Sequence, residues 1–299
     1  EAIYSAKKKI SNLKGSELYV NLEPCSHFGK TPPCVDLLIK ENIKKVFIGI
    51  KDPDKKVNGK GIKKLIDAGI DVKVGILKEK CKTLNKFFIS FIKNKRPYVT
   101  LKIAQSIDGN IALKNFKSKW ITNEKSRYFV HQMRSVYDCV LVGRNTVEKD
   151  NPELKVNIPK ERDPFRVILD SNSKLSPNLK VFKNNFDGKT IRFSNIKSNR
   201  DYDYYLKSHR NKFKIKDVLD MLYKLDFNSV IVEGGSKTFS KFLKTGLFDD
   251  IYFFVSSKIL GNGIRTFNDY SFDSLADANN LKIKSVKQFE NDVLILCNK

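Results

Sequence analysis

The sequence lacks several features that would place it in common protein classes. No apolar run approaches the length of a membrane-spanning helix, and the nearest one, over 87–92, is far too short. The five cysteines in 299 residues are odd in number and scattered, which argues against a disulfide framework and favours a cytoplasmic protein with metal or thiol chemistry. No Gly-x-Gly-x-x-Gly follows a predicted strand, so a dinucleotide site of the usual kind is not expected.

Acidic residues are also scarce: Asp and Glu number 33 against 57 Lys and Arg, a formal net charge of +24. A nucleic-acid-binding surface would explain such an excess. However, the lysines are evenly spread, and there is neither an RNP-like motif nor a basic stripe with interleaved aromatics. We therefore favour compositional drift, combined with a phosphorylated small-molecule ligand, over nucleic acid.

Apolar patterns of period 2 and 3.6 alternate along the chain and predict an α/β layer structure. The basic segment 93–97, closed by Pro97, is the best boundary, so we expect domains over 1–95 and 96–299. In the first domain we expect helices over 1–13, 35–40, 59–69 and 81–92, and strands over 18–22, 46–50 and 72–77. In the second we expect strands over 98–104, 139–143, 165–170, 190–193, 229–233 and 251–255, helices over 124–136, 216–225 and 236–243, and a hairpin over 281–297.

The segment 23–34, Glu-Pro-Cys-Ser-His-Phe-Gly-Lys-Thr-Pro-Pro-Cys, holds two cysteines nine positions apart. Cys25 follows a strand and Cys34 opens a helix, so their thiolates can meet at one tetrahedral ion, and their softness indicates zinc. Zinc deaminases add a third ligand through His-x-Glu at a preceding helix start. Glu1 opens a helix in that order, whereas a histidine two residues earlier would lie before the chain. His27 is interpreted as a substrate-side or structural residue.

Glu1-Ala2 followed by the segment 22–34 resembles the RibD family, bifunctional riboflavin-biosynthesis proteins with a pyrimidine deaminase half and a reductase half. The resemblance implies a cytidine-deaminase-like zinc domain, here expected to be incomplete at its N-terminus. It implies that Cys25 and Cys34 bind zinc and that Glu1 relays protons between the metal-bound water and the departing amine. A closed zinc knuckle, or two unrelated core thiols, are the alternatives. Without the missing histidine we expect weak zinc binding and little deamination.

Three strand ends suggest a second site. The strand over 98–104 runs into a turn at Gly109, the strand over 139–143 ends in a loop rich in donors, and Glu233-Gly234-Gly235-Ser236 joins a strand to a helix. Two glycines before a helix form a cradle in which backbone N–H groups and the helix dipole favour phosphate. Together, in this order, the three segments resemble the RibD reductase domain, which implies a dihydrofolate-reductase-like fold and NADPH.

Carried over position by position, the resemblance implies particular contacts. The cofactor contacts would be Ala104, Trp120, Thr146, Asp150, Ser171, Gly235, Ser236, Lys237, Thr238, Phe239, Ser240 and Lys241. The substrate contacts would be Lys102, Ser118, Arg134, Leu154 and Glu233. Lys102 is the catalytic candidate, because a buried cation can stabilise negative charge that develops during hydride transfer. Glu233 can accept from polar substrate groups, and Arg134 can bind an anion.

Two of these contacts have open alternatives, and a further position departs from the family's pattern. Trp120 could simply fill the core, and Arg134 could be a solvated helix residue. The family's arginine for the substrate phosphate is replaced by Asn157, so Lys155, Arg144 or Arg162 would have to compensate.

The sequence thus predicts a cytoplasmic, homo-oligomeric enzyme of riboflavin biosynthesis. It would deaminate a phosphoribosylamino-pyrimidinone with zinc and then reduce the ribose to ribityl with NADPH. Two alternatives remain: a reductase alone, or a basic zinc-containing nucleic-acid-binding protein.

Overall fold

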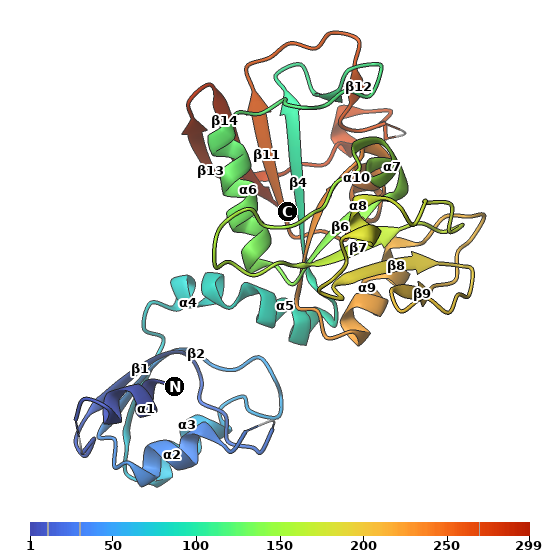
Figure 1. The fold of residues 1–299 in the computed structure, drawn as a ribbon. Helices are drawn as coiled ribbons and strands as arrows, with labels where there is room; N and C mark the ends of the chain where they lie inside the picture. Colours follow the sequence, from blue (N-terminus) through green and yellow to red (C-terminus); the bar gives the residue numbers. More distant parts are fainter. Residues whose placement is uncertain (11, 30, 269) are drawn as a thin grey trace. The chain divides into compact units, whose positions relative to one another are not determined.

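The computed structural model describes residues 1–10, 12–29, 31–268 and 270–299. Lys30, within the cysteine segment, lies outside the described residues. The chain divides into two compact units, Glu1–Lys95 and Arg96–Lys299 (Figure 1). No helix in the described ranges is both long and apolar enough to cross a membrane.

The first unit is a small parallel sheet with helices. Its elements are α1 (Ala2–Lys7), β1 (Glu17–Leu22), α2 (Cys34–Lys40), β2 (Lys45–Ile50), α3 (Lys60–Asp67), β3 (Asp71–Val74), α4 (Lys78–Leu84) and α5 (Lys86–Asn94). The strand order is β1-β2-β3, with both pairings parallel. Val46 and Ile48 of β2 pack on Val35 and Leu38 of α2 and on Leu65 of α3, which forms the core of this unit.

Two predicted helices of this unit are wrong in extent. The helix expected over 1–13 ends at Lys7, and Ser11 of that range lies outside the described residues. The helix expected over 81–92 is two helices that meet at Asn85, whose side chain donates to the Cys81 carbonyl oxygen at 2.8 Å. Asparagine competes in this way for backbone partners and so favours helix ends.

The second unit contains a nine-stranded sheet in the order β13-β14-β11-β4-β10-β6-β7-β8-β9. These strands are β4 (Tyr98–Ser106), β6 (Cys139–Gly143), β7 (Phe165–Leu169), β8 (Thr190–Ser194), β9 (Asp203–Tyr205), β10 (Ser229–Gly234), β11 (Asp250–Ser256), β13 (Lys282–Phe289) and β14 (Asp292–Asn298); β5 (Asn110–Ala112) and β12 (Ile264–Arg265) form a separate pair. The pairings from β11 to β9 are parallel, and the two pairings made by β14, with β11 and with β13, are antiparallel.

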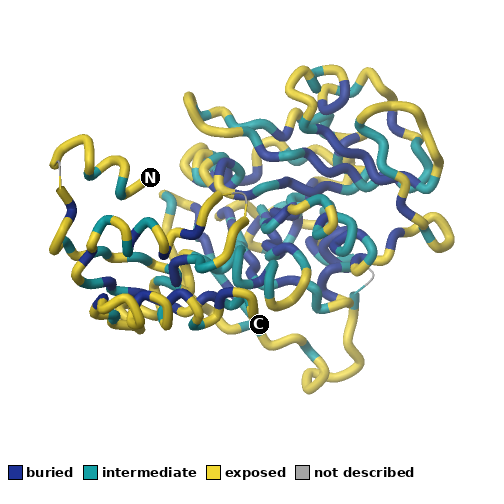
Figure 2. The backbone as a smooth tube through the Cα atoms, turned by 90° about the horizontal axis from the view of Figure 1, so that it is seen from below, coloured by how far each residue is buried: buried dark blue, intermediate teal, exposed yellow. Residues whose placement is uncertain are grey.

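Helices α6 (Glu124–Val136), α7 (Arg144–Asp150), α8 (Lys180–Lys183), α9 (Ile215–Lys224) and α10 (Ser236–Thr245) complete the unit. Figure 1 shows α6 lying along the β11–β14 side of the sheet, where the Phe129 ring packs 6.1 Å from that of Phe254. Helix α9 contributes Val218, Leu219 and Leu222 to the core, with almost no exposed area. Strands β6, β8 and β10 are buried along most of their length, whereas β13 is exposed. Figure 2 shows buried segments crossing the interior of the chain and exposed segments at its margins.

Two arginines are buried inside this sheet with complete sets of partners. Arg166 of β7 donates to Thr190 Oγ1 at 3.1 Å and to Asp187 Oδ2 at 2.9 Å. Arg192 of β8 donates to both carboxylate oxygens of Asp203, at 2.7 and 2.6 Å. Buried charge is tolerated where geometry and hydrogen bonding are this complete.

The strands expected in this unit are all present within a residue or two, and α6 spans the predicted residues. Helix α7 was expected as a loop. Its sequence, Arg-Asn-Thr-Val-Glu-Lys-Asp, contains one large apolar residue, Val147, and so carries little helical periodicity.

Candidate active site

The candidate site forms where the parallel strands β4, β10 and β6 end side by side. Val232 of β10 pairs with Leu101 of β4, so the next residue on each strand, Glu233 and Lys102, are neighbours. The register between β10 and β6 shifts between Val232 and Gly234, so Glu233 sits at a bulge. A bulge redirects a side chain at a strand end. Glu233 is thereby placed at the carboxyl edge of the sheet, where ligands bind in open α/β sheets.

Arg134 of α6 pairs with Glu233 through two hydrogen bonds. Its Nε lies 2.6 Å from Glu233 Oε1 and its Nη2 lies 2.8 Å from Oε2. Its Nη1 donates to the Lys155 carbonyl oxygen at 3.0 Å. Lys102 Nζ lies 3.9 Å from Glu233 Oε2, and the three charged side chains are 16% exposed or less. The alternative that Arg134 is a solvated helix residue is therefore wrong.

Burial and mutual attraction set the charges of this cluster. Burial alone would raise the pKa of Glu233, but Arg134 and Lys102 hold that pKa at about 2. Burial lowers the pKa of Lys102, an effect that Glu233 opposes and Arg134 reinforces. At neutral pH the cluster therefore holds one carboxylate and one guanidinium in a fixed pair, with an ammonium group that gives up its proton more readily than an exposed lysine does.

Helix α6 is anchored so that Arg134 reaches this position. Asn123 caps the helix, since its Oδ1 accepts from Ser126 N at 2.9 Å. Asp292, at the start of β14, accepts from Asn123 N and from Ser126 Oγ, both at 2.7 Å. The terminal hairpin therefore fixes the amino end of α6, and Arg134 lies in its last turn.

The glycines at the strand ends form a cradle. A Cβ atom at Gly234 would lie 2.8 Å from Thr146 Oγ1, and one at Gly143 would lie 2.7 Å from Thr238 Oγ1. Side chains are therefore excluded where β6 and β10 end, and Gly235, with φ +71°, opens α10. Backbone amides at such a helix start favour phosphate, so Thr146, Gly235 and Ser236 suit a phosphate-bearing cofactor. Two predicted contacts further along α10 do not: Phe239 packs in the core, and Ser240 Oγ donates to the Asn268 carbonyl oxygen.

Other predicted contacts lie along the same edge. Ser118 Oγ lies 3.4 Å from Asp150 Oδ1, at the end of α7, and burial raises the pKa of Asp150. Trp120 is 60% exposed, so the core-filling alternative is wrong. The Arg127 guanidinium lies 4.5 Å from the Trp120 ring centroid. An exposed ring of this kind is free to pack against a planar ligand.

Three further predicted residues lie apart from one another, one within a strand and two in segments outside the strands. Ala104 lies within β4, level with Phe254 of β11. Ser171 follows β7, and its Oγ donates to the Asn211 carbonyl oxygen at 2.7 Å. Leu154 is buried and has a left-handed φ of 58°.

Of the residues proposed to compensate for Asn157, Arg162 already binds other groups. It donates to the carbonyl oxygens of Ser135 and Val136, at 2.7 and 2.8 Å, at the end of α6. Lys155 lies close enough to Asp187 to lower the pKa of that carboxyl. Arg144, at the start of α7, therefore remains the better candidate.

The cysteine pair lies in the first unit. Cys34 N donates to Cys25 Sγ at 3.3 Å, which places the Cys25 sulfur at the start of α2, beside Cys34. Burial raises the pKa of the Cys34 thiol, and the neighbouring Cys25 thiol raises it further. Within the described ranges, however, no three His, Cys, Asp or Glu side chains are grouped to hold a metal. The residues present supply two ligands and do not by themselves fit a complete zinc site.

A buried carboxylate supports the cysteine loop. Glu23, two residues before Cys25, accepts four backbone N–H bonds, from Asp52, Gly59, Gly61 and Ile62, at 2.9 to 3.2 Å. It thus ties the end of β1 to the start of α3. Its position before Pro24 was the only sequence signal for this role, and sequence reasoning missed it.

Sequence reasoning also missed His131 and the role of Asp108. Asp108 accepts from Ser106 Oγ, Leu260 N and Gly261 N, and these bonds hold its pKa at about 2. It therefore joins the loop after β4 to the loop after β11. His131 contacts Asn157 and lies three residues before Arg134, a helical spacing that could have indicated it.

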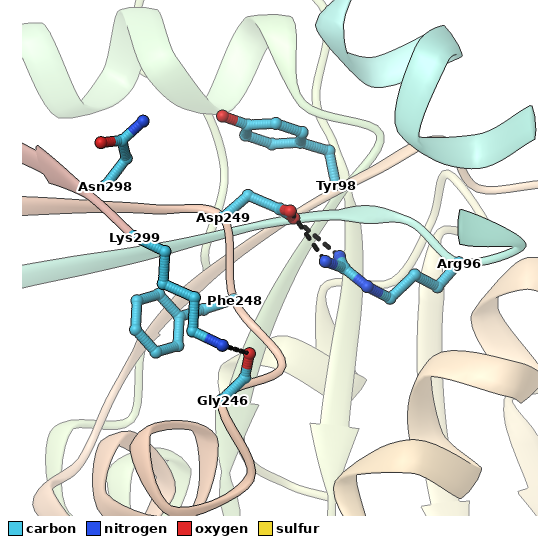
Figure 3. Close-up of a pocket in the computed structure, with 7 residues that line it drawn as sticks. All are labelled: Arg96, Tyr98, Gly246, Phe248, Asp249, Asn298 and Lys299. Atoms are coloured by element: carbon cyan, nitrogen blue, oxygen red, sulfur yellow. Dashed lines mark hydrogen bonds and ion pairs between the residues drawn. The ribbon is translucent and has the colours of Figure 1, made fainter. Parts of the chain in front are cut away.

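A shallow pocket lies at the opposite edge of this unit, where β4 and β11 begin (Figure 3). Arg96 crosses it to pair with Asp249 through two bonds of 2.7 Å, and Lys299 Nζ donates to the Gly246 carbonyl oxygen. The charged side chains that line the pocket are therefore already bound to other groups in its wall. The pocket therefore contributes nothing to the cluster at the carboxyl edge.

Comparison with known proteins gives the family. Residues 97–295 match the family described as "RibD C-terminal domain". "Riboflavin biosynthesis protein RibD" of Aquifex aeolicus is 39% identical over 287 residues, covering 94% of this chain and 80% of that protein. A Thermotoga maritima structure, titled diaminohydroxyphosphoribosylaminopyrimidine deaminase/5-amino-6-(5-phosphoribosylamino)uracil reductase, gives a TM-score of 0.87 at 40% identity, covering 99% of this chain and 83% of that one. The structure of Acinetobacter baumannii RibD gives a TM-score of 0.89 at 30% identity, covering 99% of this chain and 84% of that one.

The second unit is thus an α/β reductase domain with a dihydrofolate-reductase-like fold. The same fold recurs in the Saccharomyces riboflavin biosynthesis reductase Rib7, at 20% identity and a TM-score of 0.53 over 72% of this chain. The chain belongs to the RibD family of riboflavin biosynthesis proteins.

Proposed function

We propose that the unit Arg96–Lys299 reduces the ribose of a phosphoribosylamino-pyrimidine to ribityl with NADPH, as a step of riboflavin biosynthesis. The observation that carries this proposal is the cluster of Lys102, Arg134 and Glu233 beside the glycine cradle at one sheet edge. The name of the Thermotoga relative, a phosphoribosylamino-uracil reductase, supports the substrate class.

The residues of this chain have separable roles in such a reaction. Thr146 and the amides at the start of α10 hold the cofactor phosphates, and Trp120 packs against the cofactor. When bound, NADPH supplies the hydride. Lys102 stabilises the negative charge that develops on the substrate, and its lowered pKa suits it to donate a proton there. Glu233 keeps Lys102 and Arg134 in place and accepts from polar groups of the substrate.

Replacement of Lys102 tests this proposal. Lys102→Met keeps the length of the side chain and removes the charge, so NADPH oxidation dependent on the deaminated pyrimidine should fall by roughly 100-fold or more. Lys216→Met, on the exposed face of α9, is the matched control and should retain full activity. A Lys102→Met enzyme within about threefold of wild type would contradict the role of Lys102.

Absence of pyrimidine-dependent NADPH oxidation in the wild-type protein would contradict the reductase proposal itself. A salt-dependent shift of nucleic acid in a gel, together with such inactivity, would favour the basic nucleic-acid-binding alternative.

We further propose that the unit Glu1–Lys95 is a pyrimidine deaminase domain in which Cys25 and Cys34 are two zinc ligands and Glu1 is the proton relay. The 3.3 Å contact between Cys34 N and Cys25 Sγ favours this. The described residues do not complete the ligand set of the metal.

Metal analysis tests the second proposal. After dialysis against zinc, Cys25→Ser should hold less zinc than the wild-type chain, whereas Cys81→Ser should hold as much, since Cys81 packs against Gly49. Equal zinc content in all three proteins would refute the ligand assignment. Ammonia release from the aminated pyrimidine then tests the activity separately.

A further inference from the structure

His131 holds a segment of the candidate active site from the same helix face as Arg134. Its Nδ1 accepts a hydrogen bond from Asn157 N at 3.2 Å. Arg134, three residues later on α6, donates to the Lys155 carbonyl oxygen at 3.0 Å. Side chains three positions apart lie together on a helix, so α6 fixes the segment 155–157 at two points, one beside the Glu233 ion pair.

The segment needs such support. Leu154, which leads into it, has φ 58°, and a left-handed conformation costs a non-glycine residue about 1–2 kcal/mol. Val156 N donates to Asp163 Oδ1 at 2.7 Å. Three consecutive residues therefore each have a backbone group bound by a side chain. Strained conformations of this kind persist only where the surroundings determine them.

The bond from Asn157 requires an unprotonated Nδ1, so the neutral ring carries its hydrogen on Nε2. Burial lowers the pKa of His131, and Arg134 and Lys102 lower it further. Glu233 and the Lys155 carbonyl oxygen oppose this, but the net shift is downward. The imidazole is therefore neutral at pH 7 and available as an acceptor.

We propose that His131 is a positioning residue of the reductase site, which keeps the segment 155–157, and through it Leu154 and Arg134, in the arrangement that binds the substrate. This inference rests on the proposed reductase function. His131 acts before the chemical step, because it contacts the segment and not Lys102. Loss of its acceptor therefore weakens substrate binding and leaves hydride transfer largely intact.

Two variants separate the acceptor from the bulk of the ring. His131→Asn places an amide oxygen near the position of Nδ1 and can still accept from Asn157 N, whereas His131→Leu fills the space without an acceptor. We expect His131→Leu to raise KM for the pyrimidine about tenfold, the effect of one lost hydrogen bond, with kcat within about threefold of wild type. His131→Asn should remain close to wild type in both.

The pH dependence gives a second readout. Protonation of Nδ1 removes the acceptor, so the wild-type KM should rise as pH falls through the lowered pKa of His131, below 6.5. His131→Asn has no titrating ring and should lack this rise, and His131→Leu should have a raised KM at every pH. Arg134 stays charged and Glu233, with a pKa of about 2, stays ionised throughout pH 5 to 8. Lys102 is unchanged in His131→Asn, so any titration of Lys102 would appear in that variant as well, whereas the titration of His131 would not.

Amide hydrogen exchange at Asn157 tests the contact without any activity. Exchange should be roughly three- to tenfold faster in His131→Leu than in wild type, and near wild type in His131→Asn. Unchanged exchange in His131→Leu would overturn the proposal, as would equal KM increases in both variants or a loss confined to kcat. If the wild-type protein oxidised no NADPH, the reductase function would fail while the exchange result still decided whether His131 fixes the segment.

Discussion

Replacing Glu233 by Gln should destabilise the second unit strongly, because it removes the only carboxylate that the structure pairs with both Arg134 and Lys102 in the described part of the chain. Glutamine has nearly the same shape and can still accept one hydrogen bond from Arg134. The change is therefore one of charge, and it leaves two buried cations facing each other.

Two independent arguments give the size of the effect. Glu233 has a pKa of about 2 instead of 4.5, and at about 1.4 kcal/mol for each pKa unit this lowering corresponds to on the order of 3 kcal/mol. Breaking one partner of a buried ion pair typically costs about 3–5 kcal/mol. The two values agree, so we expect a loss of roughly 3 kcal/mol in the free energy of unfolding.

Urea unfolding at pH 7 measures this loss. Far-ultraviolet circular dichroism follows both units, and the fluorescence of the single tryptophan, Trp120, reports on the second unit alone. The wild-type protein should lose the same stability with acid. Because the folded pKa of Glu233 is depressed, its contribution is complete above pH 4.5 and is lost as the pH falls toward 2.

A double variant checks the cause. Arg134→Met combined with Glu233→Gln removes one of the two buried cations, so it should be more stable than Glu233→Gln alone. A Glu233→Gln protein within about 1 kcal/mol of wild type would refute the electrostatic argument, and so would a double variant whose losses simply add.

Three other variants test neighbouring features. Asn123→Ala removes the cap of α6 and should lower the free energy of unfolding by about 1 kcal/mol, measured by the same urea titration; no change would mean that Asp292 suffices. Gly234→Ala places a Cβ 2.8 Å from Thr146 Oγ1 and should raise KM for NADPH more than KM for the pyrimidine, contrary to a purely structural defect. Gly61→Ala places a Cβ 2.1 Å from the Pro24 carbonyl oxygen and should lower the melting temperature of the first unit but not that of the second, as differential scanning calorimetry would show.

The regular elements of the second unit followed from the sequence because their apolar patterns are long and periodic. The runs over 139–142 and 230–232 are continuous and apolar, as expected for strands buried on both faces. Helix α7 and the short strands β5 and β9 have too few apolar residues to show a period, and tertiary contacts decide their conformation.

The sequence placed Lys102 within a strand and Glu233 at the end of another, but it could not show that they are neighbours. That depends on β10 pairing with β4, which are more than 100 residues apart in the chain, and on the bulge at Glu233. The partner of Arg134 was unknown for the same reason. Glu23 was missed because a carboxylate that binds only backbone amides leaves no partner side chain to recognise.

The buried cations show where lysine and arginine cannot replace each other. Arg166 and Arg192 lie buried in the sheet, and Arg134 lies on α6 with little exposed area. Each of these guanidinium groups spans two or more acceptors, a geometry that an ammonium group cannot reproduce. Under the proposed function Lys102 is the contrary case, since arginine there could not release a proton. An exchange between the two basic residues is therefore constrained at these four positions, because three need the planar geometry of a guanidinium group and one needs an ammonium group that can lose its proton.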